Sequence, residues 1–277
     1  MIDPRLTLVR DGVACTALEG IVRAERYVAP IAMRCARPAA PIRKVPDAGA
    51  GTEDQLIFGE AFDVLLTEGE FSFGQARRDS YVGFVETAAL VAGAGEPTHW
   101  VSALRTYAFR RPDLKSAPRG LYTQNSFVTV TGRDGRFVEA EGAGWMVQEH
   151  LLPIGVYLDD PADLAKAYLA APYQWGGRES AGLDCSGLVQ QALYAAGRAG
   201  PRDTDMQGAR VGRPVGRAEL RRGDLVFWPG HVAMMIDETR ILHANAHHMA
   251  VAREPVSEAI ARIQAAGSGV TSVRRPV

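Results

Sequence analysis

The chain has 277 residues, which is enough for two or three domains. Apolar residues make up 47% and charged residues 23%, and a formal net charge of -1 leaves no basic excess for nucleic acid or an anionic membrane surface. No apolar run approaches the roughly 20 residues of a membrane span, and the first residues lack the apolar stretch of a secretory signal. We therefore expect no nucleic-acid partner and no membrane partner.

The three cysteines, Cys15, Cys35 and Cys185, are far apart in the sequence. An odd count without a CxxC pair argues against a disulfide framework and against a structural zinc site. The cysteine pattern is typical of a protein in a reducing cytoplasm, which is the location we expect.

Residues 1–27 are predicted to form an N-terminal arm, with weak helical character over 14–27. From there to about residue 158, short alternating apolar runs such as AFDVLL (61–66) are broken by Gly, Pro and Asp. This rhythm predicts short antiparallel strands.

The strand-rich half also repeats itself. Two pairs of segments resemble each other: VAPIAMRCARP (28–38) with VSALRTYAFRRP (101–112), and DSYVGFVETAAL (79–90) with GAGWMVQEHLL (142–152). The spacing predicts two small β-barrels, over 28–92 and 99–158, joined by a linker at 91–99.

The last part, 160–277, opens with a helix signal. Asp160 is a predicted N-cap followed by proline, and apolar spacing near 3.6 predicts a helix over 163–171. After a Gly-rich loop, apolar residues recur at helical spacing from Leu188 to Ala196, which predicts an amphipathic second helix ending at Gly197. Four strands should follow: DLVFW (224–228), HVAMMID (231–237), RILHA (240–244) and MAVAREPV (249–256). Helices followed by a strand meander predict an α+β fold.

Cys185 lies at the predicted start of the second helix. Free N–H groups and the helix dipole favour an anion there, so we expect a thiol with a lowered pKa and improved nucleophilicity. The same N–H groups could receive an oxyanion after the thiolate attacks a carbonyl.

A base is also needed, and His231 begins a predicted strand with His243 in the next one. The two share a sheet face only if the connecting loop has an odd number of residues, so we expect an odd loop around Asp237–Thr239. His243 could then hold the His231 imidazole in the correct tautomer, as the third member of a triad does.

Other interpretations of these residues exist. A lone buried cysteine is usually a small hydrophobe, which is the interpretation we take for Cys15 and Cys35. A His/His/Cys zinc site is possible in principle, but a cysteine at a helix start with histidines in adjoining strands suits nucleophilic catalysis better. We expect no metal.

Taken together, PYQWGG, LDCSGLVQQAL, RRGDLVFWPGHVAMMI and ILHA resemble the NlpC/P60 family of cysteine peptidases over residues 160–256. The two β units before them resemble bacterial SH3-type barrels. The resemblance implies a papain-like domain over 160–277 and a layout similar to cytoplasmic γ-D-glutamyl-L-diamino-acid endopeptidases that recycle cell-wall peptides.

The resemblance also implies roles for individual residues. Cys185 would be the nucleophile, with His231 as base and then acid and His243 orienting it. Tyr173 and Trp175 would line the site, and the Tyr173 hydroxyl would contact the oxyanion. Asp184 and Ser186 would help to hold the free amine of an N-terminal L-Ala, since a carboxylate pairs with an ammonium.

In the relatives, the first SH3-like unit also contributes to amine recognition. The matching candidates here are Glu53, in GTEDQLIFGE, and Tyr81, in DSYVGF. The SH3-like units would then limit substrate length rather than bind the wall.

The resulting hypothesis is a cofactor-free cysteine endopeptidase. It would cut the bond between γ-D-Glu and meso-diaminopimelate or L-Lys in small murein peptides that begin with L-Ala. Two alternatives stay open: a thioester-forming amidase or acyltransferase, and a non-catalytic wall-binding SH3 protein. The sequence makes no prediction of the oligomeric state.

Overall fold

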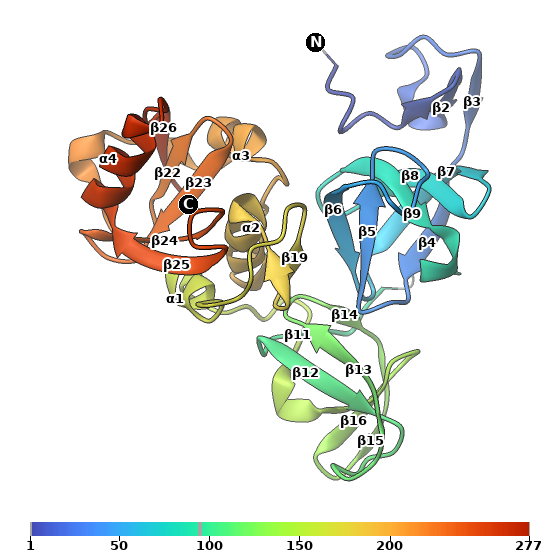
Figure 1. Ribbon diagram of the computed structural model, residues 1–277. Helices are drawn as coiled ribbons and strands as arrows, with labels where there is room; N and C mark the ends of the chain where they lie inside the picture. Colours follow the sequence, from blue (N-terminus) through green and yellow to red (C-terminus); the bar gives the residue numbers. More distant parts are fainter. Residues whose placement is uncertain (1, 94–95, 277) are drawn as a thin grey trace. The chain divides into compact units, whose positions relative to one another are not determined.

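The structure is a computed structural model that describes residues 2–93 and 96–276 (Figure 1). The chain forms two compact units, residues 1–154 and 155–277. Residues 94 and 95 of the predicted linker lie outside the described residues. None of the helices described is both long enough and apolar enough to cross a membrane.

The chain begins with a small sheet rather than a helix. Its three strands are β1 (Val9–Arg10), β2 (Val13–Cys15) and β3 (Arg26–Val28). The helix expected over 14–27 is wrong, because only a 3-10 turn, Thr16–Leu18, forms there. Gly20 has a φ of 77°, which no right-handed helix accommodates, and β3 returns to pair in parallel with β2.

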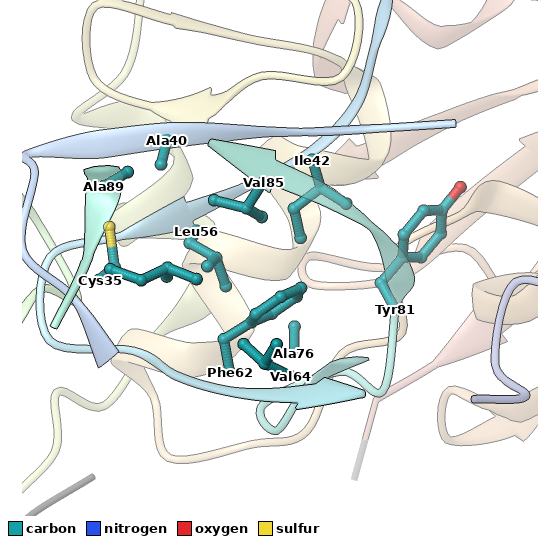
Figure 2. Packing of buried hydrophobic residues seen from close by; sticks show 11 residues of the cluster. Cys35, Ala40, Ile42, Leu56, Phe62, Val64, Ala76, Tyr81, Val85 and Ala89 are labelled. Carbon is teal, nitrogen blue, oxygen red and sulfur yellow. The ribbon is translucent and has the colours of Figure 1, made fainter. Parts of the chain in front are cut away.

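A seven-stranded antiparallel sheet forms the first β unit, in the order β10-β4-β7-β8-β9-β5-β6. Its strands are β4 (Ile31–Cys35), β5 (Ala39–Arg43), β6 (Thr52–Ile57), β7 (Ala61–Glu68), β8 (Phe71–Ala76), β9 (Val82–Glu86) and β10 (Leu90–Ala92). Side chains that alternate along these strands fill a core in which Ile42, Leu56 and Phe62 are fully buried (Figure 2). Phe71, Phe73 and Phe84 belong to a second buried cluster.

The second β unit repeats this topology. Its strands are β11 (His99–Val101), β12 (Arg105–Phe109), β13 (Pro118–Thr123), β14 (Phe127–Val128), β15 (Val130–Asp134), β16 (Phe137–Ala140), β17 (Gly144–Val147) and β18 (Leu151–Pro153). They form two sheets, ordered β14-β11-β18 and β13-β12-β17-β16-β15. With β14 and β15 together in the place of β7, the strand order equals that of the first unit.

The predicted repeat is therefore confirmed, with one correction. The 3-10 turn Thr87–Ala89 between β9 and β10 recurs as Gln148–His150 between β17 and β18, as the second repeat pair implies. The first repeat pair is wrong by one strand, because it joins β4 to β12. By pairing, β4 corresponds to β11 and β5 to β12.

The compact unit formed by residues 155–277 is α+β, as predicted. It is built on a six-stranded antiparallel sheet ordered β21-β26-β22-β23-β24-β25. Its helices are α1 (Pro161–Lys166), α2 (Cys185–Ala195), α3 (Thr204–Arg210) and α4 (Val256–Ala265). The sheet strands are β21 (Arg213–Pro214), β22 (Leu225–Trp228), β23 (His231–Met235), β24 (Arg240–Asn245), β25 (Ala250–Pro255) and β26 (Ser272–Arg275). A separate pair, β19 (Arg178–Glu179) and β20 (Gly182–Leu183), precedes α2, and a 3-10 turn, Arg217–Glu219, precedes β22.

Four predicted strands, β22 to β25, are confirmed. Several elements of this unit were not predicted. They include the helices α3 and α4, the short strands β19, β20 and β21, and β26, which returns to pair antiparallel with β22. The first predicted helix is shorter than expected. Ala170 adopts a φ of 68° and donates its N–H to the Val251 carbonyl, so the chain leaves the helix to meet β25.

The central helix α2 is buried on all sides rather than on one face. All eleven of its residues are buried, including the glutamines that its amphipathic pattern predicted to be exposed. Gln190 and Tyr194 satisfy their polar groups by donating to the Gly200 carbonyl, each at 3.0 Å. A helix of this kind belongs to the centre of a domain, which makes its N-terminus a well-fixed place for a reactive group.

Candidate active site

Cys185 is the first residue of α2, and its sulfur faces the start of β23. Sγ lies 4.0 Å from the Gly230 carbonyl oxygen, and the Val232 N–H donates to the sulfur. The chain on both sides of His231 thus contacts the thiol, which places that histidine beside it. Cys185 is 6% exposed, so almost all of the residue is shielded from solvent.

The expectation of a lowered thiol pKa is wrong. Burial, with the negative charge of Asp184, raises the pKa of Cys185 to about 12. The N–H of Val232, the charge of Arg202 and the N–H of Ser186 act in the opposite direction, but they do not outweigh desolvation. The resting thiol is therefore neutral, and it must lose its proton during the reaction.

His231 and His243 lie on one face of the sheet. Met234 pairs with Leu242 and Met235 with Ile241. The Ile236 N–H donates to the Arg240 carbonyl, which leaves a three-residue loop, 237–239, and confirms the odd count. His231 Nε2 lies 2.8 Å from His243 Nδ1. Because Nε2 is engaged in this contact, Nδ1 of His231 is the nitrogen left for the thiol.

Both imidazoles are neutral at rest. Burial lowers the pKa of each histidine to about 3, with neighbouring positive charge, including Arg262, as a further cause. A neutral thiol beside a neutral imidazole is a pair ready for proton transfer, and the ion pair forms only when an electrophile arrives.

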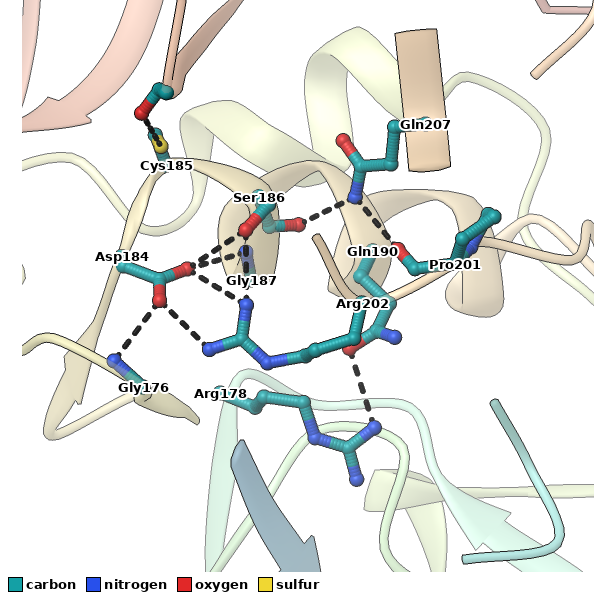
Figure 3. A network of polar contacts seen from close by, with 11 residues as sticks. Gly176, Arg178, Asp184, Cys185, Ser186, Gly187, Gln190, Pro201, Arg202 and Gln207 are labelled. Atoms are coloured by element: carbon teal, nitrogen blue, oxygen red, sulfur yellow. Dashed lines mark hydrogen bonds and ion pairs between the residues drawn. The ribbon is translucent and has the colours of Figure 1, made fainter. Parts of the chain in front are cut away.

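Asp184 holds the N-terminus of α2 through both carboxylate oxygens (Figure 3). Oδ1 accepts from Gly187 N–H at 2.7 Å and Oδ2 from Gly176 N–H at 2.9 Å. Arg202, itself 1% exposed, adds a two-pronged ion pair at 3.0 and 2.7 Å. The carboxylate is thus an N-cap and half of a buried ion pair, while its expected role as an amine anchor stays a prediction.

Ser186 belongs to the same network. Its hydroxyl donates to Asp184 Oδ1 at 3.2 Å and accepts from Arg202 at 2.9 Å. Its carbonyl accepts from Gln207 Nε2 at 2.9 Å, and the same amide reaches the Pro201 carbonyl. The segment 201–207 therefore anchors the first turn of α2 from outside the helix.

Tyr173 lies in the loop before β19, close enough for charge on Cys185 and Asp184 to affect its titration. Burial and these two groups raise the pKa of Tyr173 to about 12, so its hydroxyl stays a donor at neutral pH. Its N–H donates to the Met249 carbonyl, which fixes the loop against the strand side of the unit. Trp175, two residues on, is 66% exposed.

Glu53 and Tyr81 belong to the other unit. Glu53 is half-buried on β6, and Tyr81 is a buried member of the first β unit's core, just before β9 (Figure 2). Their assignment to amine recognition stays a prediction.

A further polar cluster lies behind His243. His243, His248 and Glu254 present ligand atoms within 4.8 Å of one another. Glu254 also forms an ion pair with Arg262 of α4, and His248 Nδ1 contacts Asn245 Oδ1 at 2.9 Å. An arginine on the carboxylate opposes a cation at this place.

Three residues of the site were not singled out from the sequence: Arg202 and Gln207, which support the start of α2, and Glu254, which lies behind His243. The segment PRDTDMQ stands out in the sequence as polar, but nothing local shows which of its members turns inward. A buried arginine requires a partner, and the acid just before Cys185 was the available signal. Glu254 had no comparable signal.

Comparisons with known proteins match both the strand-rich part of the chain and the part that contains Cys185. The NlpC/P60 family pattern matches residues 170–266, and the pattern of the bacterial dipeptidyl-peptidase Sh3 domain matches residues 42–90. The matched part of the second unit contains Cys185, both histidines and the Asp184 network.

Two curated relatives are similar to parts of the chain. Dipeptidyl-peptidase 6 of Lysinibacillus sphaericus is 32% identical over 99 residues, which are 36% of this chain and 36% of that protein. Gamma-D-glutamyl-L-lysine dipeptidyl-peptidase of Bacillus subtilis (strain 168) is 28% identical over 215 residues, 69% of this chain and 72% of that protein. The chain thus spans about a third of the first relative.

The fold is also found in a solved structure. The crystal structure of an NlpC/P60 family protein from Bacillus cereus ATCC 10987 matches with a TM-score of 0.76 at 19% identity, covering 88% of this chain and 99% of that one. The predicted fold class, an α+β catalytic domain preceded by SH3-like β structure, is confirmed.

Proposed function

Since residues 170–266 carry an NlpC/P60 domain and residues 42–90 an SH3 domain of the bacterial dipeptidyl-peptidase type, we propose that this chain is a cysteine peptidase acting on cell-wall peptides. The bond cut is the one between γ-D-Glu and an L-diamino acid, either L-Lys or meso-diaminopimelate. One observation carries the proposal: a thiol at the start of a buried helix meets the strand that begins with His231, and His231 is held by His243.

The arrangement of the side chains suggests a role for each of them in the reaction. Cys185 Sγ attacks the γ-carbonyl carbon while its proton passes to His231 Nδ1, so charge separates only as the bond forms. The carbonyl oxygen becomes an oxyanion at the N-terminus of α2, where backbone N–H groups favour negative charge. The hydroxyl of Tyr173, kept protonated by its raised pKa, is a further donor.

His231 then returns the proton to the leaving amine of the diamino acid, which breaks the peptide bond and leaves a thioester on Cys185. Water, deprotonated by the same imidazole, attacks the thioester and releases the acid product. These are the acid and base roles of one histidine in covalent catalysis.

A tripeptide assay tests the proposal. L-Ala-γ-D-Glu-L-Lys and its meso-diaminopimelate counterpart should each release the free diamino acid, detected by chromatography, and Cys185→Ala should abolish release while circular dichroism stays unchanged. Hydrolysis by the alanine variant would show that another residue is the nucleophile.

The same assay addresses recognition of the substrate's amine. Tripeptides with free and with acetylated L-Ala should differ in rate if Asp184 and Ser186 contribute to an ammonium site. Equal rates on both peptides would contradict that part of the proposal and leave the peptidase assignment standing.

We further propose a role in recycling wall peptides in the cytoplasm. Its support is the chemistry of the cysteines: Cys15, Cys35 and Cys185 are all free thiols, as in proteins of reducing compartments. Cell fractionation with an antibody to the native protein tests this, and recovery of the protein from the wall fraction would contradict it.

A further inference from the structure

Glu254 lies behind His243 and has no place in the mechanism given above. We propose that Glu254 is a positioning residue: its carboxylate keeps a proton on His243 Nε2 and thereby sets the protonation of His231. The expected effect on catalysis rests on the proposed peptidase function. The positions of the protons on His243 and His231 can be measured without any turnover.

The register of the sheet puts the side chains of His231, His243 and Glu254 on one face. On β24 and β25, His243 pairs with Ala252 and Ile241 pairs with Glu254. Residues two apart share a face, so Glu254 is the diagonal neighbour of His243, within reach of a long side chain. Its Oε1 lies 2.8 Å from His243 Nε2.

The order of protons follows from these contacts. A carboxylate accepts and does not donate, so a proton is favoured on His243 Nε2. That tautomer leaves His243 Nδ1 as an acceptor for the N–H at His231 Nε2, 2.8 Å away. His231 then presents a bare Nδ1, which is the nitrogen required to take the proton of the Cys185 thiol.

Arg262 of α4 fixes the carboxylate. The guanidinium donates to Glu254 Oε1, the same oxygen that approaches His243. The Glu254 side chain is only 12% exposed, so its position is set by the arginine rather than by solvent. The pair thus ties the C-terminal helix to the back of the site.

His243 Nε2 has no aligned hydrogen bond among the described residues, although the imidazole is 1% exposed. The 2.8 Å approach of Glu254 Oε1 is off the N–H direction. Terminal carboxylate torsions are broad, so the Glu254 carboxylate can turn toward the His243 N–H while its other oxygen keeps the ion pair with Arg262. A buried donor left without a partner is costly, which favours that rotation as charge develops on His231.

A cation held by His243, His248 and Glu254 is the rival explanation for this cluster. It would place a metal on His243 Nε2 instead of a proton. Arg262 on the same carboxylate argues against it, because two positive charges would share one oxygen.

The first test uses the wild-type protein and needs no substrate. Long-range proton–nitrogen NMR correlation on protein labelled with nitrogen-15 histidine reports which ring nitrogen carries the proton. The His243 signals are identified by their absence in His243→Asn. We expect the Nε2–H form for both His243 and His231, and an Nδ1–H form at His243 would overturn the inference.

The second test is kinetic. Glu254→Gln keeps size and shape while removing the charge, and we expect kcat to fall about 10- to 100-fold with KM changed less than about twofold, as for loss of a group that orients a functional histidine. Glu258→Gln on α4 is the matched control, because Glu258 is exposed and should leave kcat unchanged. A wild-type kcat in Glu254→Gln would refute the role.

A double-mutant cycle separates positioning from general structural damage. If Glu254 acts through His243, Glu254→Gln should cost nothing further in a His243→Asn background, whereas a purely structural contribution adds in both backgrounds. Additive losses would overturn the inference. Circular dichroism and the melting temperature show whether each variant is folded.

The metal rival has its own outcome. Treatment with EDTA should leave kcat unchanged, and His248→Ala should behave like wild type. Loss of activity on chelation that Zn²⁺ restores would replace the proton by a metal and overturn the inference. If no peptide is cleaved at all, the proposed function fails, while the NMR measurement still decides the tautomer.

Discussion

Cys185 shows how far local position alone determines the chemistry of a residue. A helix start predicts an acidic thiol, yet burial beside Asp184 raises the pKa to about 12. The position of the thiol was readable from the sequence, whereas the desolvation that reverses its pKa is a property of the whole fold. The thiolate of Cys185 therefore forms only when the substrate is bound, and it is not present in the resting enzyme.

Alkylation rates test the neutral thiol. Iodoacetamide reacts with the thiolate, so the rate at Cys185 should rise about tenfold per pH unit from about pH 6 to 10, with no plateau at low pH. Mass spectrometry of the modified peptide gives the rate, and Cys185→Ala corrects for Cys15 and Cys35. A plateau below about pH 5 would reveal a preformed thiolate–imidazolium pair.

The Asp184–Arg202 ion pair predicts that removing one partner destabilises the fold more than replacing both. Arg202→Met leaves a buried carboxylate without its partner, and we expect it to reduce the free energy of unfolding by about 3–5 kcal/mol. Asp184→Asn together with Arg202→Met should cost less than Arg202→Met alone, because asparagine still caps α2 and no charge is stranded. Urea unfolding of the wild type and of both variants measures these losses. If the double variant is the least stable, charge pairing is not the main contribution of this contact.

At the scale of elements, α2 depends on a close approach by the Gly-rich loop. A Cβ on Gly187 would lie 2.3 Å from the Gly177 carbonyl oxygen, which is far inside contact distance. The same loop carries Tyr173 and gives its Gly176 N–H to Asp184. The glycine therefore allows the loop and the helix to form one rigid rim around the thiol.

Gly187→Ala tests that approach. Alanine normally stabilises a helix interior relative to glycine, but here we expect a loss of about 1–3 kcal/mol from overpacking and a fall in kcat. Gly208→Ala on α3 is the matched control, since its added Cβ would meet Phe227 at an ordinary 3.5 Å. Equal effects of the two substitutions in urea unfolding would rule out the steric explanation.

The hairpin of β23 and β24 was the best-predicted element of the site. Parity alone requires an odd loop if His231 and His243 share a face, and the register has it. No such rule locates α4 or β26, whose placement depends on pairing with β22 across a long stretch of chain. Glu254 was missed for the same reason, because its partner Arg262 lies in α4.

At the scale of the molecule, stability should depend on pH on both sides of neutrality. His231 and His243 have lowered pKa values in the folded chain, so the unfolded chain binds more protons below about pH 6.5 and stability falls there by up to about 1.4 kcal/mol per pH unit for each histidine. Cys185 has a raised pKa, so its contribution is lost above about pH 8.5.

Hydrogen exchange of the amides in β23 and β24 measures how the stability of the unit formed by residues 155–277 depends on pH. Protection should decrease toward about pH 4 after correction for the intrinsic exchange rate. His243→Asn should flatten the acid limb and Cys185→Ala the alkaline limb. Unchanged slopes in both variants would assign the pH dependence to other groups.

The division of the chain into domains could be predicted from the sequence, because it shows in an internal repeat and in the periodicity of apolar residues. Two β units and an α+β unit follow from short alternating runs and one internal repeat. The strand equivalences needed the pairing itself, because VSALRTYAFRRP matches the sequence of β4 while occupying the place of β5. The N-terminal sheet was missed since its strands are only two or three residues long.

The shared strand order of the two β units has a historical meaning. A chain that uses one topology twice in succession is the expected product of a tandem gene duplication, after which each copy is free to drift. The bacterial Sh3 pattern matches residues 42–90 of the first copy, and the second copy has split the counterpart of β7 into β14 and β15. The split strand means that one inherited topology can close around its core with either an unbroken or an interrupted central strand.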